Sequence, residues 1–251
     1  MKIQAFSLRN IKEFEDHKEV NFFYNAGGLY AIVAIHKGGP QIPSFGATRL
    51  WQYHSFQEAL IDVLKLSKTM TYKATMAGLP YGGAKGVIMG SKYNLANRKL
   101  LFSHYSEHIK TMGNFVTGAD VSVTYEDLLV MKEKNSNIVG LKSDAVGFTV
   151  LGVYYGIKVC LHNVFGDEDV AGRTFAIQGL GQVGIGLVNL LKNQGAKIII
   201  ADIDKTQIKH AHKMFPDLKI VSSQEIHKEK VDVFCPCAMG GILNEQSIEE
   251  L

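Results

Sequence analysis

TFAIQGLGQVG, residues 174–184, is the stretch that decides the fold of the C-terminal part of the chain. Its first five residues are typical of a buried strand, and the GxGxxG pattern from Gly179 then opens a helix. Gly195 ends that helix, and AKIIIAD, residues 196–202, is typical of a second strand. A strand, a helix and a strand within roughly 30 residues form a βαβ unit. Such a unit predicts a parallel sheet.

The glycine pattern predicts a dinucleotide site. Gly179 allows a tight turn, Gly181 lets the backbone approach a pyrophosphate, and Gly184 lets the helix pack closely on the strand. Gln182 and Val183 lie at the helix N-terminus, where free N–H groups and the positive dipole end favour phosphate. The alternative is a glycine-tolerant turn that binds no ligand, but the strand before the pattern and the helix after it favour the site.

Asp202 ends the second strand, about 20 residues after the glycines, where an acidic side chain binds the ribose 2′-hydroxyl. Asp204 adds a second carboxylate, and Lys205 is the nearest basic residue. Two carboxylates repel a 2′-phosphate. We therefore expect NAD rather than NADP as the cofactor.

Outward from this unit, Phe148 to Phe165 reads as a long apolar helix, and we place a domain boundary just before it. The expected domains are residues 1–147 and residues 148–251, and the second carries the predicted dinucleotide site. In the first domain we expect these elements: a strand at 29–36, a helix at 56–73 capped by Ser55, a glycine-rich turn at 82–86, and helices at 94–112 and from Thr124.

The expected fold class is α/β, with a mixed sheet in the first domain and a Rossmann-like second domain. Further strands in the second domain are expected at 219–221 and 231–235. A complete doubly wound domain has about six strands, whereas four can be placed. We therefore expect a dinucleotide domain that is incomplete at its C-terminus.

Composition is that of a globular protein, with 46% hydrophobic and 20% charged residues and a net charge of +3. No apolar run reaches the ~18 residues of a membrane span, and the charged N-terminus lacks a signal-peptide core. The basic residues are scattered, which gives no case for nucleic acid. Three cysteines suit a reducing cytoplasm, and the spacing of Cys235 and Cys237 does not suit zinc. We expect a cytoplasmic protein with no metal site and no membrane or nucleic-acid partner.

Two lysines suggest acid–base chemistry. Lys73 ends the helix segment MTYK, and Lys85 lies in GGAKG, where glycines suggest close approach of a ligand. Neighbouring cationic groups and burial both lower the pKa of a lysine, so that one of the pair can act as a general base. The alternative is a solvated surface charge. Asp120 follows Gly118 and Ala119, and by turn chemistry alone it is more often a turn-former than a catalyst.

In this order, the motifs resemble those of the glutamate, leucine, phenylalanine and valine dehydrogenase family, and are closest to its leucine-type members. The resemblance covers nearly the whole chain and is carried by these segments: FGATRL (45–50), MTYKATMAGLPYGGAKGVI (70–88), TGADVSVTYEDL (117–128), TVLGVYYGI (149–157), GLGQVG (179–184), ADIDK (201–205) and CPCAMGG (235–241). It implies NAD-dependent, reversible oxidative deamination of an apolar, branched-chain amino acid to a 2-oxo acid and ammonia. It also implies a homo-oligomer assembled through the first domain.

The resemblance further implies roles for individual residues. Lys85 would activate water as a base, and Asp120 would exchange a proton with the substrate amino group, which replaces the turn-former interpretation. The implied substrate-binding residues are Lys73, at the α-carboxylate, with Phe45, Gly46 and Gly118. The implied cofactor-binding residues are Thr149, near the nicotinamide, Gly179, Gly181, Gln182, Val183, Gly184, Asp202, Cys237 and Ala238.

Other substrates and another class of protein stay open at this point. Glutamate-type relatives carry a lysine where this chain has Phe45, which argues against glutamate, while Gly118-Ala119 resembles the phenylalanine-type segment. The stretch before Thr149 lacks the family's prolines, so no role is assigned to Asp144. Relatives continue beyond the position of Leu251. The alternative is therefore a truncated, non-catalytic paralogue that binds nucleotide or a partner. We expect either that the chain by itself has weak or no turnover, or that another chain covers the gap.

Overall fold

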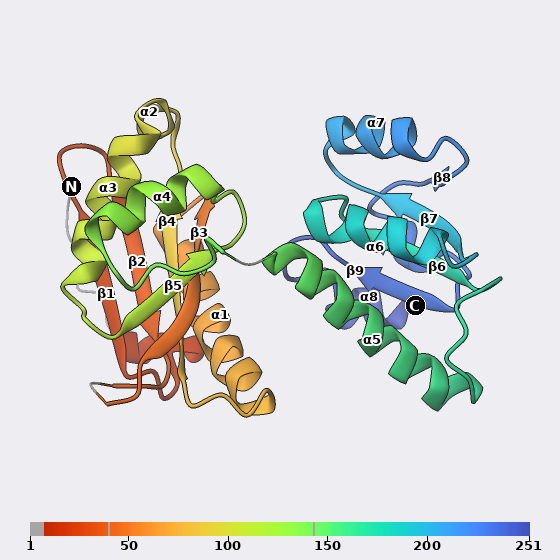
Figure 1. The fold of residues 1–251 in the computed structure, drawn as a ribbon, viewed down its shortest axis with the longest axis horizontal. Helices are drawn as coiled ribbons and strands as arrows, with labels where there is room; N and C mark the ends of the chain where they lie inside the picture. Colours follow the sequence, from red (N-terminus) through yellow and green to blue (C-terminus); the bar gives the residue numbers. More distant parts are fainter. Residues whose placement is uncertain (1–7, 40, 143) are drawn as a thin grey trace. The chain divides into compact units, whose positions relative to one another are not determined.

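The structure, a computed structural model, describes residues 8–39, 41–142 and 144–251, so the first seven residues of the charged N-terminus lie outside it. The chain divides into two compact units, residues 1–143 and 144–251, shown in Figure 1. Each contains its own sheet. The α/β fold class with a mixed sheet and a Rossmann-like unit is confirmed.

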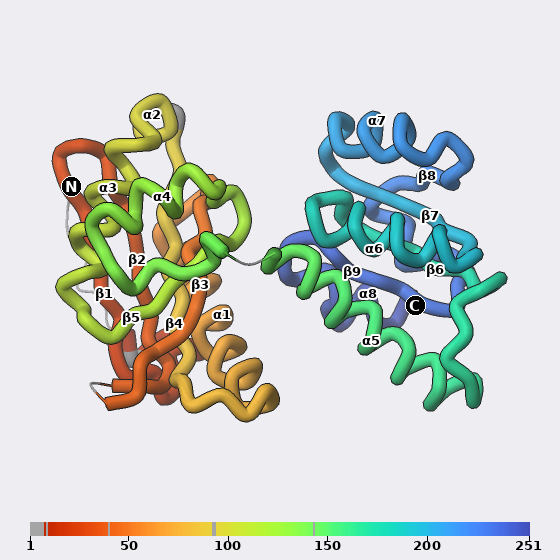
Figure 2. Tube along the Cα trace, in the orientation of Figure 1, coloured from red at the N-terminus to blue at the C-terminus, as the bar shows by residue number. Residues whose placement is uncertain are grey.

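Unit 1 is built on a five-stranded sheet. Its strands are β1 Glu19–Tyr24, β2 Tyr30–Ile35, β3 Ser44–Trp51, β4 Gly82–Met89 and β5 Phe115–Ala119. They lie in the order β1-β2-β4-β3-β5. β1, β2 and β4 pair antiparallel, whereas β3 lies parallel to both β4 and β5. The sheet is therefore mixed, and Figure 2 traces its strands through the unit.

Helices cover both faces of this sheet. α1, Phe56–Met76, packs Leu60, Val63 and Leu64 with Ile32 and Val87 on one face. α3, Arg98–Lys110, and α4, Tyr125–Lys134, belong to the core on the other face. The capping prediction at α1 holds, since the Ser55 hydroxyl accepts from the Glu58 N–H. The short helices are η1 Leu8–Asn10, η2 Lys12–Phe14 and α2 Lys92–Ala96.

The single helix predicted at 94–112 is wrong, because α2 and α3 are separate helices. Asn97 between them has φ −116° and ψ 44°, outside the helical region. The Asn94 side chain completes a capping box with Ser91 and donates to the carbonyls of Gly28 and Met89. These bonds fix the start of α2, and the chain turns before α3 begins.

The glycine-rich turn predicted at 82–86 is also wrong, because these residues form the first part of strand β4. A Cβ on Gly83 would lie 2.1 Å from the backbone nitrogen of Thr71 and 2.6 Å from the carbonyl oxygen of Ser67, both on α1. The glycine therefore allows a helix to lie directly on the strand. Close packing inside the unit, rather than a turn or the approach of a ligand, explains it.

Unit 2 contains a four-stranded parallel sheet. Its elements are α5 Ala145–Phe165, β6 Thr174–Gln178, α6 Gln182–Lys192, β7 Lys197–Ala201, α7 Lys205–Met214, β8 Lys219–Ile220, η3 Ile226–Lys228, β9 Val233–Pro236 and α8 Glu245–Glu249. The strands lie in the order β8-β7-β6-β9. Those predicted at 174–178 and 196–202 are confirmed as β6 and β7, and β8 is shorter than predicted. The central position of β6 puts the glycine loop at the middle of the sheet.

α5 begins at Ala145 rather than at Phe148, because the Asp144 side chain caps it by accepting from the Gly147 N–H. The helix packs Ile157 and Leu161 into the core of unit 2. Much of its remaining apolar surface is exposed. Within the described part of the chain, it is the helix that is long and apolar enough to cross a membrane, by length and composition alone. Counting only uninterrupted apolar residues missed this property.

Candidate functional site

The candidate catalytic residues lie on the face of the unit 1 sheet that α1 covers. Thr48 of β3 bonds to Thr117 of β5 and to Tyr105 of α3, so both threonines point to the opposite face. Because side chains alternate along a strand, Phe45 and Arg49 of β3 point toward α1. The Arg49 side chain bonds to Asp120, directly after β5, which brings that carboxylate to the same face.

Lys85 of β4, which is buried, and Asp120, which is partly buried, form an ion pair. The Lys85 Nζ lies 3.1 Å from the Asp120 Oδ2, with side-chain exposures of 5% and 24%. The backbone N–H of Asp120 donates to the carbonyl of Thr48 at 3.0 Å, which fixes the carboxylate beside β3. The structure thus brings together the two residues to which the resemblance gave proton-transfer roles.

Sequence reasoning missed a third member of this cluster, Arg49. Its Nε donates to the same Asp120 oxygen at 2.7 Å, and its Nη1 donates to the Oδ2 of Asp62 on α1 at 2.9 Å. The Tyr53 hydroxyl donates to that Asp62 oxygen at 2.7 Å. The sequence did offer a clue. Arg49 lies four residues after Phe45, so in a strand the two side chains share one face, and a charged side chain on a buried face needs charged or polar partners.

Burial and charge shift the proton affinities of the pair. Burial lowers the pKa of Lys85 below that of an ordinary lysine, and the positive charges of Arg49 and Lys73 lower it further, against the charge of Asp120. Burial by itself would raise the pKa of Asp120, but the charges of Lys85 and Arg49 outweigh it and hold that pKa low. The carboxyl is therefore ionised near neutral pH, and the amine gives up its proton more readily than usual.

Lys73 lies in the last turn of α1, with its side chain exposed. Its charge acts on Lys85, so the two predicted lysines share one region of unit 1. An exposed ammonium beside a buried acid–base pair is suited to hold the carboxylate of a small molecule.

Phe45 and Tyr81 form an aromatic wall, with ring centroids 5.6 Å apart. Tyr81 was not predicted, although it directly precedes the GGAKG segment. Gly46 is buried, and a Cβ there would lie 2.0 Å from the carbonyl oxygen of Ala84. Gly118 lies in β5, where a Cβ would be 3.4 Å from the carbonyl oxygen of Val139. Both glycines therefore lie against the protein's own backbone.

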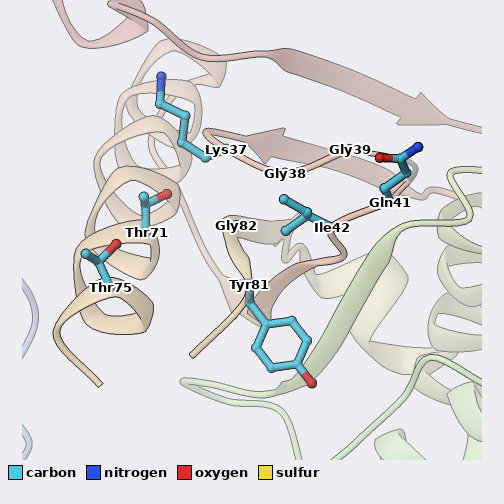
Figure 3. Close-up of a pocket in the computed structure, with 9 residues that line it drawn as sticks. All are labelled: Lys37, Gly38, Gly39, Gln41, Ile42, Thr71, Thr75, Tyr81 and Gly82. Atoms are coloured by element: carbon cyan, nitrogen blue, oxygen red, sulfur yellow. The ribbon is translucent and has the colours of Figure 1, made fainter. Parts of the chain in front are cut away.

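A cavity of about 610 Å³ lies beside this wall, between α1 and the segment that follows β2. Figure 3 shows Thr71 and Thr75 of α1 on one side and Ile42 and Tyr81 on the other. None of the predicted site residues lines it. Tyr81 connects the cavity to the predicted site, because it lines the cavity and its ring contacts Phe45.

In unit 2, the glycine loop has the geometry of a phosphate-binding turn. Gly179 has φ +96°, a conformation that favours glycine, and a Cβ on Gly184 would lie 1.9 Å from the Gly179 carbonyl oxygen. A Cβ at Gly181 would meet no described atom within 4 Å, so this backbone is open to a ligand. Within the described residues, no side chain caps α6, which begins at Gln182 and leaves the first N–H groups, including that of Val183, for an anion.

Asp202 directly follows β7 and lies beside this loop. Its Oδ2 accepts from the Leu180 N–H at 2.6 Å, and its Oδ1 accepts from the Asp204 N–H at 2.8 Å. Each oxygen keeps a second lone pair. The carboxylate is thus held at the edge of the glycine loop, where a ribose hydroxyl could donate to it.

The segment after β9 also lies against the loop. The Cys237 N–H donates to the Gln178 carbonyl at 2.7 Å, and a Cβ on Gly179 would lie 2.6 Å from the backbone nitrogen of Ala238. Burial raises the pKa of the Cys237 thiol to about 11, so this thiol is protonated near neutral pH. Thr149 lies on α5, where its hydroxyl donates to the Ala145 carbonyl at 2.7 Å. In the described part of the chain, no group of three His, Cys, Asp or Glu side chains could hold a metal ion.

Known proteins resemble the chain over nearly its whole length. A family model described as Glu/Leu/Phe/Val dehydrogenase, dimerisation domain, matches residues 24–140. Phenylalanine dehydrogenase from Bacillus thermotolerans is 36% identical over 99% of this chain and 67% of that protein. Leucine dehydrogenase from Geobacillus stearothermophilus is 35% identical over 95% of this chain and 66% of that protein. The chain therefore spans about two thirds of the length of these curated relatives.

Solved structures agree with the sequence comparisons. The crystal structure of L-tryptophan dehydrogenase from Nostoc punctiforme matches with a TM-score of 0.64 at 33% identity, over 94% of this chain and 68% of that one. The hetero-hexameric glutamate dehydrogenase from Thermus thermophilus, in a leucine-bound form, gives a TM-score of 0.71 over 89% of this chain and 60% of that one. At 19% identity, the second match shows a shared fold alone.

Proposed function

The chain belongs to the glutamate, leucine, phenylalanine and valine dehydrogenase family, and from this premise we propose that it catalyses the NAD-dependent, reversible oxidative deamination of an apolar L-amino acid. The products are the 2-oxo acid and ammonia. The observation that carries the proposal is the buried contact between Lys85 and Asp120, in which the pKa of both groups is lowered.

The chemistry follows from these two side chains. The ionised carboxylate of Asp120 accepts a proton from the substrate ammonium group, which frees the nitrogen lone pair. A bound nicotinamide ring would accept a hydride from the substrate α-carbon. Lys85, as a neutral amine, then removes a proton from the water that attacks the resulting imine carbon. It returns a proton as ammonia leaves. Lys73 holds the substrate α-carboxylate, and burial of Lys85 keeps bulk water from its amine.

The residues of unit 2 fit a dinucleotide. The open backbone at Gly181 and the uncapped start of α6, among the described residues, suit a pyrophosphate, and Asp202 suits a ribose 2′-hydroxyl. Asp202 together with Asp204 disfavours a 2′-phosphate, which supports NAD rather than NADP. Cys237, Ala238 and Thr149 are proposed as further cofactor contacts.

The first prediction concerns substrate and cofactor choice. Phe45 and Tyr81 offer apolar surface, and burying an unpaired side-chain carboxylate against it is costly. In an NADH absorbance assay, kcat/KM for leucine, valine or isoleucine should exceed that for glutamate. NAD should be preferred to NADP by roughly tenfold or more, because like charges repel.

The matched variant for this prediction is Phe45→Lys, which places a cation in the aromatic wall. It should raise glutamate use relative to leucine. A higher kcat/KM for glutamate than for every branched-chain amino acid in the unaltered chain would overturn the apolar assignment. Tight NAD binding without turnover of any amino acid would instead favour a nucleotide-binding protein.

The second prediction concerns Lys73. Lys73→Met removes the proposed partner of the substrate carboxylate but leaves the buried pair in place. We expect KM for the amino acid to rise by roughly 10- to 100-fold, the cost of losing a charged hydrogen bond, while kcat changes less. Steady-state kinetics with saturating NAD test this. A fall in kcat with an unchanged KM would place Lys73 in the proton chemistry instead.

Assembly and location are part of the same proposal. The matching family model is described as a dimerisation domain and covers residues 24–140 of unit 1. We therefore propose a homo-oligomer that assembles through unit 1, and we propose the cytoplasm as its location because the three cysteines are free. Light scattering on the purified chain measures the mass of the assembly, and a monomeric mass at working concentration would contradict the oligomer.

A further inference from the structure

Lys85 would be a poor base if Asp120 were its only partner. A buried lysine that pairs with one carboxylate is held as the ammonium, because losing its proton leaves a buried anion uncompensated. Yet the proposed function requires this amine to release and regain a proton. Another group must therefore stabilise the carboxylate while Lys85 is neutral.

Arg49 is placed to stabilise the Asp120 carboxylate while Lys85 is neutral. Its Nε donates at 2.7 Å to the same Asp120 oxygen that Lys85 approaches at 3.1 Å. The residue is 8% exposed, and a guanidinium keeps its proton at every working pH. Arg49 therefore always presents a positive charge to Asp120, whereas Lys85 does so only while it is protonated.

The far side of the guanidinium is also fixed. Asp62 of α1 accepts from the Arg49 Nη1, and Tyr53 donates to the same Asp62 oxygen. A planar fork held at both ends has little freedom to leave Asp120. The cluster therefore runs as a continuous chain of bonds from Tyr53 through Asp62 and Arg49 to Asp120.

We propose that Arg49 is a positioning residue that holds the Asp120 carboxylate permanently, so that Lys85 can exchange its proton without leaving that carboxylate unpaired. Asp62 and Tyr53 keep Arg49 in place. The inference rests on the proposed function, in which Lys85 is the base.

The charges around Lys85 agree with this role. The charged groups that act on Lys85 are Asp120 after β5, Arg49 from β3 and Lys73 from α1. Asp62 of α1 lies next to Arg49, and His36 follows β2, the strand that pairs with β4. Burial lowers the pKa of His36, which bonds to Thr71 and Asp16. With the imidazole neutral, the cations Arg49 and Lys73 balance the carboxylates Asp62 and Asp120 when Lys85 is neutral.

The test measures the pKa of Lys85 without any need for turnover. The full chain is labelled with ¹³C at lysine Cε and titrated by NMR, and Lys85→Arg assigns the signal. In Arg49→Gln, Lys85 loses a repelling cation and becomes the sole cationic partner of Asp120 among the residues that the structure describes. Its pKa should rise by about one pH unit or more. An unchanged or lower pKa in a folded Arg49→Gln chain would overturn the proposal.

Asp62→Asn should change the pKa of Lys85 in the opposite direction, and it keeps the shape of the side chain. Its amide oxygen can still accept from Arg49 and Tyr53, so Arg49 stays in place while the anion that offsets its charge is removed, and the pKa of Lys85 should fall. If Arg49→Gln does not fold, this variant decides, and an unchanged or raised pKa in it counts against the proposal. The matched control is Arg98→Gln, which breaks the Arg98–Asp127 pair elsewhere in unit 1 and should leave Lys85 unaltered.

Activity measurements test the proposed function separately. If no amino acid is turned over but the titrations show the expected shifts, the electrostatic role of Arg49 stands and the dehydrogenase assignment fails. If turnover is present, the acidic limb of the kcat/KM profile should move to higher pH in Arg49→Gln. Arg49→Lys, which restores the cation, should move that limb back toward its original position.

Discussion

Lys85→Ala is expected to lower kcat by roughly 10²–10⁴-fold, the usual contribution of a general acid–base group. The amine is buried beside Asp120, and burial holds its pKa below that of an ordinary lysine. A neutral amine in that position can take a proton from water, and alanine cannot. The fold should survive, because Arg49 still pairs the carboxylate of Asp120.

Lys85→Arg separates the proton transfer from the charge. Arginine keeps a cation near Asp120 but does not act as a base near neutral pH, so this variant should be as slow as Lys85→Ala. The control is Lys99→Met, an exposed lysine on α3, which should leave kcat unchanged. Near-normal kcat in Lys85→Ala would assign the base to another group.

The protonation of Lys85 also determines the pH dependence of the unaltered chain. A base works when deprotonated, so kcat/KM should rise with pH through the pKa of Lys85. Because that pKa is lowered from the ordinary 10.5, the rise should be complete at a lower pH than for an exposed lysine. A profile that falls over the same interval would contradict the role.

Local patterns predicted the central βαβ unit of unit 2, although not the start of α5 or the helix α7. The turn at Gly179, the close packing at Gly184 and the acidic end of β7 all lie within one βαβ unit, whose contacts are short in sequence. The structure of such a motif is determined by its local sequence, so it can be predicted without knowledge of distant contacts. The parallel pairing of β6 with β7 followed from the same pattern.

Unit 1 was predicted less well, because its decisive contacts join distant segments. GGAKG reads locally as a turn, and only the presence of α1 against Gly83 explains why those glycines lie in a strand. Arg49 and Asp62 come together through the packing of α1 on β3, for which a single sequence offers no spacing rule. Lys85 and Asp120 were paired by resemblance to a family, whereas turn chemistry by itself had favoured a structural role for the aspartate.

Asp120→Asn is expected to lower kcat by roughly 10²–10⁴-fold and, at the same time, to lower the pKa of Lys85. The negative charge of Asp120 is the main influence that raises this pKa, against burial and the charges of Arg49 and Lys73. Asparagine keeps the shape and can still accept from Arg49, but it cannot take a proton from the substrate ammonium group. The remaining activity should therefore reach its plateau at a lower pH than in the unaltered chain.

Measuring kcat/KM against pH for both chains tests the two effects together. A small loss of kcat would remove the proton-exchange role from Asp120, and an alkaline shift of the profile would show that its charge does not act on Lys85 as the geometry requires.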